Sequence, residues 1–457
     1  MISVRAGLAA LVILGALLGP AGEPVAAQEE GLFERDRLTG DWGGVRKQWE
    51  DAGVALGATD VSETLSNPTG GIRPLTIYQG LLDVSLNLDL EKVANWPGAT
   101  FYTDGYWISG RGLSENAIGN LLFVSSIEAL ASTRLHDLWL QQEFLDHKAS
   151  LRVGQIAFDD EFYISQYAAG FVNSSFGCPD TLSNDLPSGG PCYPFATPGA
   201  RLRVAPTSDL TLTAAVFNGN PAPAGPGNPQ VRNSSGTNFL IGEGGFMPIA
   251  ELAYSFDEEP ISSIPLSDVK LGAWYHTGEF PDQRRDSSGL SLASPASNGI
   301  PAMRGSNFGA YMVVDKMLWR RPDTATQGLA AFLRLGYAPP DRNLFSLEID
   351  AGLTFKGLFP NRELDVLGVG VVYGRIGYAR RLDHDQVLFT GIERPIRDYE
   401  SVLELTYEAR VAPWWLLQPD LQLVFHPGGY ISAPLPAPVG RPIPNALVLG
   451  LRSGITF

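Results

Sequence analysis

The sequence has 457 residues, of which 44% are hydrophobic and only 18% are charged, against a typical ~25% for soluble domains. Its 49 acidic and 33 basic residues give a formal net charge of −16, which argues against a nucleic-acid-binding protein and against an anion-selective pore. The 51 glycines and 34 prolines favour many turns over long helices.

The first residues resemble an export signal. Arg5 precedes an apolar run over 6–19, and the small residues of Val25–Ala27 suit a cleavage site before Gln28. A signal peptide is therefore predicted over 1–27; a membrane anchor is the alternative, but the run is shorter than the ~20 residues that a spanning helix needs. No later stretch reaches the roughly 18 apolar residues of a spanning helix, which leaves a soluble exported protein or a transmembrane β-barrel.

Residues 28–52 are predicted to form an N-terminal periplasmic helical segment. Trp42, Val45 and Trp49 share one face at helical spacing, and Gly53 suits the end of a helix. The expected role of this segment is packing against the periplasmic mouth of a barrel, with gating or plugging as the alternative.

The rest of the chain, 53–457, shows the two-residue alternation of β-strands, most clearly over 81–90. Many candidate strands have ten residues or more, which suits the ~9–11 of a lipid-spanning strand better than the ~5–6 usual in globular proteins. The sixteen candidates are 53–62, 77–90, 98–108, 133–145, 148–157, 199–205, 210–217, 246–256, 267–277, 307–317, 327–337, 344–357, 365–378, 399–410, 414–425 and 445–457.

The connections between these candidates alternate between short and long, which a β-sandwich has no reason to show and a transmembrane barrel does. Short links such as "DH", "APTS" and "VAP" are expected on the periplasmic side, with longer ones at 257–266 and 318–326. The long links are 63–76, 109–132, 158–198, 218–245, 278–306, 379–398 and 426–444, and only 338–343 breaks the pattern. The prediction is a 16-stranded antiparallel transmembrane β-barrel, with a soluble periplasmic sandwich as the alternative.

The last strand is predicted to close this barrel. Its outward face would consist of Leu447, Leu449, Leu451, Ile455 and Phe457, and Arg452 would face the lumen. Pairing with the first strand would leave no free edge. A terminal aromatic residue such as Phe457 resembles the signal that barrel-assembly machinery recognises.

The longest link, 158–198, is expected to fold into the barrel as a third loop and narrow it. It contains Cys178 and Cys192, which in an exported protein are expected to form a disulfide and stiffen the loop rather than bind a metal.

No enzyme is predicted. The sequence has neither a GxSxG nucleophile elbow nor a Walker A loop, and His136 and Asp137 are adjacent strand residues, which should point to opposite faces. Asp159, Asp160 and Glu161 could bind a cation such as calcium or act as acid and base, but a solvated loop start explains them as well. No cofactor and no metal are expected.

A channel for neutral sugars would line its constriction with charged or amide groups for hydroxyls and aromatic groups for ring faces. A structural role competes with solute contact at each candidate. The candidate constriction residues are Arg73, Trp107, Arg111, Glu115, Glu128, Arg134, Arg152, Asp160, Glu161, Asn173 and Phe176.

Nearly the whole mature chain resembles the carbohydrate-selective porins of the OprB type. The resemblance rests on "LTGDWGGVRKQWEDAG", "SNPTGGIR", "LDLEKVANWPGATF", "GRGLSENAIGNL", "RLHDLWLQQEF", "LRVGQIAFDDEF", "FVNSSFG", "YPFATPGARL", "ESVLELTYEARVAPWWLLQPDLQLVFHPGG" and "NALVLGLRSGITF", in this order. It implies a sixteen-stranded outer-membrane barrel through which glucose-like sugars diffuse passively, with an eyelet of charged and aromatic residues. Arg73 and Arg111 lie inside matched motifs; the cysteine pair does not belong to the family pattern.

Two other functions stay open: a general or cation-preferring porin, and an outer-membrane enzyme or adhesin that uses the loops. The expected partners are neutral sugars, outer-membrane lipid and the barrel-assembly machinery, with no nucleic acid. The sequence leaves the oligomeric state open between monomer and trimer.

Overall fold

The computed structural model describes residues 31–457 except 243, 257–266, 323, 325 and 435–439. The predicted signal peptide and the 257–266 link lie outside the described residues. Among the residues that are described, no helix is long and apolar enough to cross a membrane.

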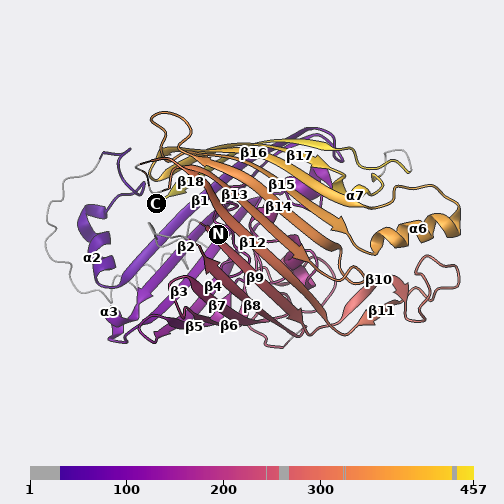
Figure 1. Ribbon diagram of the computed structural model, residues 1–457, viewed down its shortest axis with the longest axis horizontal. Helices are drawn as coiled ribbons and strands as arrows, with labels where there is room; N and C mark the ends of the chain where they lie inside the picture. Colours follow the sequence, from indigo (N-terminus) through magenta and orange to yellow (C-terminus); the bar gives the residue numbers. More distant parts are fainter. Residues whose placement is uncertain (1–30, 243, 257–266, 323, 325, 435–439) are drawn as a thin grey trace, which may run out of the picture.

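Sixteen strands form one closed antiparallel barrel, each hydrogen-bonded to its neighbours in chain order, with β1 paired to β18 (Figure 1). Every strand predicted from the sequence is present. The strands are β1 (Val54–Thr69), β2 (Leu75–Asp89), β3 (Ala99–Gly110), β4 (Ser132–Phe144), β5 (Ala149–Ile156), β6 (Thr197–Val204), β7 (Leu210–Asn218), β8 (Phe246–Ser255), β9 (Ser267–His276), β12 (Asn307–Arg320), β13 (Gly328–Tyr337), β14 (Phe345–Lys356), β15 (Val366–Ile376), β16 (Tyr399–Ala412), β17 (Trp415–Phe425) and β18 (Ala446–Thr456).

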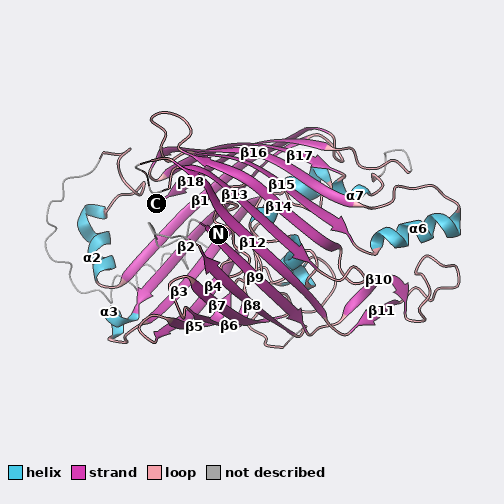
Figure 2. Ribbon diagram, in the orientation of Figure 1, coloured by secondary structure: helices cyan, strands magenta, loops and turns pink. Residues whose placement is uncertain are grey.

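The remaining elements are short and connect or cover the strands (Figure 2). They are α2 (Val45–Asp51), α3 (Leu90–Ala94), α4 (Asp180–Ser183), α5 (Pro229–Arg232), α6 (Ala379–Thr390), α7 (Pro427–Tyr430), the hairpin of β10 (Phe280–Asp286) and β11 (Pro301–Arg304), and single turns at Trp42–Gly44, Ser114–Ile118, Ser174–Phe176 and Pro187–Gly189. Helices α2 and α3 lie at one end of the barrel, and α6, β10 and β11 lie at the other (Figure 1). We call these the short-turn end and the long-loop end.

Strand β16 illustrates how the alternating sequence divides the barrel into two faces. Glu400 and Glu404 are fully buried toward the lumen, whereas Leu403 and Leu405 on the opposite face are 39% and 44% exposed. An apolar outer face suits lipid, and a polar inner face suits a hydrated lumen.

The seam between β1 and β18 closes the barrel as the sequence predicts. Glu63 of β1 lies opposite Arg452 of β18, and the Arg452 Nε donates a hydrogen bond of 2.5 Å to the Glu63 carboxylate inside the barrel. Leu449 and Leu451 are 46% and 47% exposed on the outer face. The two predicted faces of the last strand are therefore correct.

The prediction of a long first link over 63–76 is wrong. Strand β1 continues to Thr69 and β2 begins at Leu75, so the link is only 70–74. Pro68, which suggested a loop, lies where the register with β18 shifts between Ser66 and Thr69. A proline is tolerated there because no ladder hydrogen bond is required of it.

The N-terminal segment packs on the seam at the short-turn end. The Leu38 N–H donates to the Thr456 carbonyl at 2.8 Å, and Arg46 Nη1 donates to the Phe457 carbonyl at 3.0 Å. Helix α2 confirms the predicted helical turn, and Gly53 follows it with a φ of +91°, which favours glycine. A gating role of this segment stays a prediction.

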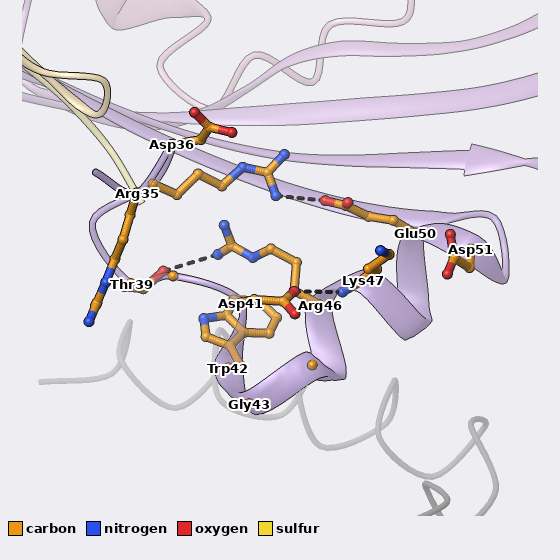
Figure 3. Close-up of a pocket in the computed structure, with 13 residues that line it drawn as sticks. Arg35, Asp36, Thr39, Asp41, Trp42, Gly43, Arg46, Lys47, Glu50 and Asp51 are labelled. Carbon is orange, nitrogen blue, oxygen red and sulfur yellow. Dashed lines mark hydrogen bonds and ion pairs between the residues drawn. The ribbon is translucent and has the colours of Figure 1, made fainter. Parts of the chain in front are cut away.

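A cavity of about 650 Å³ lies within this segment, lined by residues 35–37, 39–44, 46, 47, 50 and 51. Figure 3 shows the Arg46 guanidinium above the Trp42 ring, 4.2 Å from the ring centroid, and the Arg46 Nη2 donates a hydrogen bond to the Thr39 hydroxyl. Because all of its lining comes from this one segment outside the strands, the cavity belongs to the packing of the barrel end and not to the lumen.

Candidate functional site: a lumen narrowed by two inward loops

Two of the long links fold back into the barrel. We call residues 111–131 the second loop and residues 157–196 the third loop. Backbone N–H groups of both loops meet carboxylates on the inner face of strands more than a hundred residues away in the chain, on the opposite wall. The predicted inward fold of the third loop is confirmed.

Three glutamates of β14 and β16 hold these loops by their backbones. Glu348 accepts the N–H groups of 180 and 181 at 2.8 and 2.9 Å, and Glu404 accepts those of 172 and 173 at 2.7 and 3.0 Å. Glu400 accepts the N–H groups of 121 and 122 at 2.8 and 2.7 Å. Hydrogen bonds to a carboxylate are about twice as strong as hydrogen bonds between neutral groups, which suits these residues to loop attachment. Part of the acidic composition of the chain therefore serves this structural purpose.

Asn173 and Phe176 serve this attachment instead of lining a pore. Asn173 is fully buried; its amide caps the next turn at the Ser175 N–H (3.1 Å) and donates to Gln422 (3.1 Å). Phe176 packs against Phe171 and Phe332, with ring centroids 4.4 and 5.7 Å away. The structure therefore places both predicted constriction residues in the core that fixes the third loop.

Four of the predicted constriction residues lie around the second loop. Arg73 is exposed and donates to the Asn116 carbonyl at 2.9 Å, which joins the first link to this loop. Arg111 and Glu115 are also exposed. Glu128 is buried and accepts the Ser114 N–H at 3.0 Å. Burial raises the pKa of the Glu128 carboxyl to about 7, although the N–H donors oppose the shift.

Arg134 of β4 is also buried, with 2% of its surface exposed. Its guanidinium donates to the Asn233 carbonyl and lies 4.7 Å from the centre of the Phe195 ring. It thus joins the third loop to the 218–245 link and has little surface left for a solute.

Trp107 does not fit the predicted constriction. The neighbouring Tyr106 stacks on His136 at 4.3 Å and contacts Tyr193 of the third loop, so it faces inward. Because successive strand residues alternate, Trp107 faces outward, and it is 59% exposed. It lies on the outer surface, where an aromatic girdle would be expected.

Arg152 and Glu161 form a charged group on the inner wall, together with Arg201. Arg152 Nη1 and Arg201 Nε lie 2.6 and 3.0 Å from the two Glu161 oxygens. The two arginines lie directly opposite each other on β5 and β6, and Glu161 of the third loop offsets their repulsion. Arg201 was missed, although the alternation in 197–204 places it on the same face as Thr197, which is buried.

A stack of aromatic rings supports this charged group. The Arg152 guanidinium lies 3.7 Å from the centre of the Trp139 ring, and Tyr102 stacks on the same tryptophan at 5.0 Å. Cation–π contact and stacking restrict the arginine to one orientation. The lumen wall here presents the Arg152 guanidinium and the Glu161 carboxylate, with side chains 16% and 10% exposed, while Arg201 is buried and holds Glu161 in place.

The three consecutive carboxylates at 159–161 separate in the fold. Asp159 accepts the Tyr193 N–H at 3.3 Å, Glu161 pairs with the two arginines, and only Asp160 is exposed. They therefore do not converge on one cation, as a calcium site would need.

His136 and Asp137, expected on opposite faces, lie on the same face. Thr103 pairs with Leu138 and Gly105 with Leu135, so two residues of β4 oppose the single Asp104 of β3. This is a β-bulge, which turns both side chains inward. His136 and Asp137 are each 3% exposed.

The predicted disulfide joins Cys178 and Cys192 in the third loop, with their Cα atoms 6.3 Å apart. Beside it lies a cavity of about 440 Å³ that is lined by the second and third loops and by Asn228–Gln230, with Glu128, Asp159 and Asp180 among its acidic groups. The disulfide therefore supports one wall of a space inside the loops.

Reduction of Cys178–Cys192 is expected to widen the channel. In the chain-entropy model, a closed loop of about 15 residues contributes roughly 3 kcal/mol, and the two cysteines are 14 positions apart. Liposome swelling with sugars of increasing size, before and after dithiothreitol, measures the size limit. A protein with both cysteines changed to serine is the control and should not respond to the reductant. An unchanged size limit in the reduced wild type would remove the disulfide from the mechanism.

A closed sixteen-stranded barrel with an apolar outer face and a lumen narrowed by inward loops defines a porin-type channel. The model of the carbohydrate-selective porin, OprB family matches residues 76–457, and the chain belongs to this family. Its place is the bacterial outer membrane.

Known relatives agree with this assignment. The chain is 25% identical over 462 residues to Porin B of Pseudomonas aeruginosa, covering 96% of each chain, and 24% identical over 490 residues to the Putative porin QuiX of Acinetobacter baylyi, covering 99% of each. The high-pH structure of Pseudomonas putida OprB has the same fold, with a TM-score of 0.82, 22% identity and coverage of 94% of this chain and 100% of that one.

Proposed function

We propose that the protein lets neutral sugars, glucose-like monosaccharides above all, diffuse passively through a constriction between the third loop and strands β3 to β6. The observation that supports this most directly is the fixed Arg152–Glu161–Arg201 group beside Trp139. Guanidinium donors and carboxylate acceptors held side by side match vicinal hydroxyl groups, which both donate and accept.

The alternative is a general or cation-preferring porin, motivated by the net charge of −16. The structure weakens this argument for a cation-preferring porin. Several lumen carboxylates, such as Glu348, Glu400 and Glu404, are fully buried and occupied by loop N–H groups. Their charge is therefore less available to attract mobile cations than the sequence alone suggests.

Liposome swelling with glucose and a size-matched compound without hydroxyl groups tests the proposal. Wild-type protein should pass glucose faster. Arg152→Gln should weaken glucose binding, since one charge-assisted hydrogen bond contributes ~1.5–3 kcal/mol. The glucose concentration that produces half of the maximal change in single-channel conductance should therefore rise about tenfold.

Arg375→Gln is the matched control, because Arg375 is exposed on β15, on the face opposite to buried Gly374 and Ile376. It should behave as wild type. Equal rates for the two solutes in the wild type would favour the general porin.

A further inference from the structure

The bulge in β4 gathers a group of metal-ligating side chains at the lumen wall. His136, Asp137 and Asp160 each place one potential ligand atom in the group, and these three atoms lie within 4.8 Å of one another. A fourth group, Asp104 of β3, lies 3.5 Å from the His136 Nδ1 through its Oδ2. The group lies beside the Arg152–Glu161–Arg201 group, because Asp160 precedes Glu161 in the chain and the Trp139 that contacts Arg152 also donates a hydrogen bond to Asp137.

The imidazole of His136 is the unusual member. It is 3% exposed, yet neither ring nitrogen has a hydrogen-bond partner among the described residues. Stacking on Tyr106 at 4.3 Å holds the ring plane. Buried polar atoms normally find partners because leaving them unpaired is costly. The Nδ1 faces the Asp104 carboxylate at 3.5 Å, whereas the Nε2 has no hydrogen-bond partner in the described structure.

The two carboxylates differ in a way that suits an accessible metal site. Asp137 is held rigidly, accepting the Ala157 N–H and the Trp139 Nε1–H, each at 3.1 Å. Asp160 is exposed, in contrast to His136 and Asp137, and lies at the open side of the group. One fixed and one exposed carboxylate provide a preformed base and a ligand that can close on an ion entering from the lumen.

We propose that His136, Asp137 and Asp160 bind one divalent metal ion of the kind represented by Zn²⁺. One imidazole and two carboxylates form a three-ligand set with further positions left for water. The imidazole selects against Ca²⁺ and Mg²⁺, which prefer oxygen ligands throughout. Zinc needs ligand distances of ~2.0–2.2 Å, so the donor atoms must approach one another, and rotation of the exposed Asp160 side chain provides the approach.

Isothermal titration of the full-length, EDTA-treated protein in detergent with ZnCl₂ alone tests the site. One Zn²⁺ per chain is expected, and His136→Gln and Asp160→Asn should each weaken binding at least tenfold. The exposed His147, paired with Glu143 in a turn, gives the matched control, and His147→Gln should leave the affinity unchanged. Ca²⁺ should not compete at equal concentration.

Cobalt provides a second readout, because Co²⁺ in such a site develops visible d–d absorption that Asp160→Asn should abolish. Heat-modifiable gel mobility identifies correctly folded variants. Absence of stoichiometric Zn²⁺ binding in the wild type, or equal affinity in folded His136→Gln, would overturn the proposal. Both measurements are made without sugar, so neither outcome bears on sugar diffusion.

Discussion

Replacing Glu348 and Glu404 together by alanine is expected to raise single-channel conductance several-fold and to abolish discrimination among sugars. The two side chains accept four backbone N–H groups of the third loop. Each buried N–H left without an acceptor costs roughly 1–3 kcal/mol, which the loop avoids by moving into water. The constriction would then open while the strand ladder of the barrel remains intact.

Planar-bilayer recordings of wild type, the two single variants and the double variant measure this effect. The single variants should lie between the extremes. Glu408→Ala is the matched control, because Glu408 lies four positions further along β16 on the same face and accepts no hydrogen bond from the third loop in the described structure. If conductance of the double variant equals that of wild type, the glutamates do not hold the loop.

Deletion of Phe457 is expected to lower the amount of protein in the outer membrane by at least an order of magnitude. In the folded barrel the Phe457 N–H donates to the Ala58 carbonyl at 2.9 Å, which extends the seam, and its carbonyl accepts from Arg46. We propose that, before folding, the same aromatic residue is the signal that the assembly machinery binds. Losing both roles removes recognition and weakens closure of the barrel.

Membrane fractionation with an antibody against the loops measures the assembled amount, and swelling assays measure selectivity of the fraction that does assemble. Phe457→Ala should behave like the deletion, whereas Phe457→Tyr should assemble nearly as wild type. Arg46→Gln keeps the aromatic residue and loses the hydrogen bond to the Phe457 carbonyl together with the contacts to Thr39 and Trp42, so it should reach the membrane at normal levels. Normal assembly of Phe457→Ala would refute the signal role.

The strands could be predicted because their signal is local: each alternates over enough residues to reveal two faces, as in β18. The links were harder. The 63–76 segment looked like a loop because of Pro68, and only the partner strand β18 shows that the ladder tolerates it. The β10–β11 hairpin and α6, inside long links, carried no comparable pattern and were not predicted.

The candidate site was predicted less well than the fold. Residue type and loop membership suggested Asn173 and Phe176, yet whether a loop residue faces the lumen or the loop core depends on partners such as Gln422 and Phe332. For His136, simple alternation failed because a bulge shifts the register by one residue. Neither a distant partner nor a bulge is visible in a single sequence.

The manner in which the third loop is attached bears on how such channels can diversify. Its anchors on Glu348 and Glu404 are almost all main-chain N–H groups, which every residue except proline supplies. Loop side chains that face the lumen, unlike the buried Asn173 and Phe176, can therefore be exchanged without disturbing this attachment. A lineage, or a protein engineer, could rewrite the solute preference of the channel by changing the loop's lumen-facing residues while the scaffold that carries them stays constant.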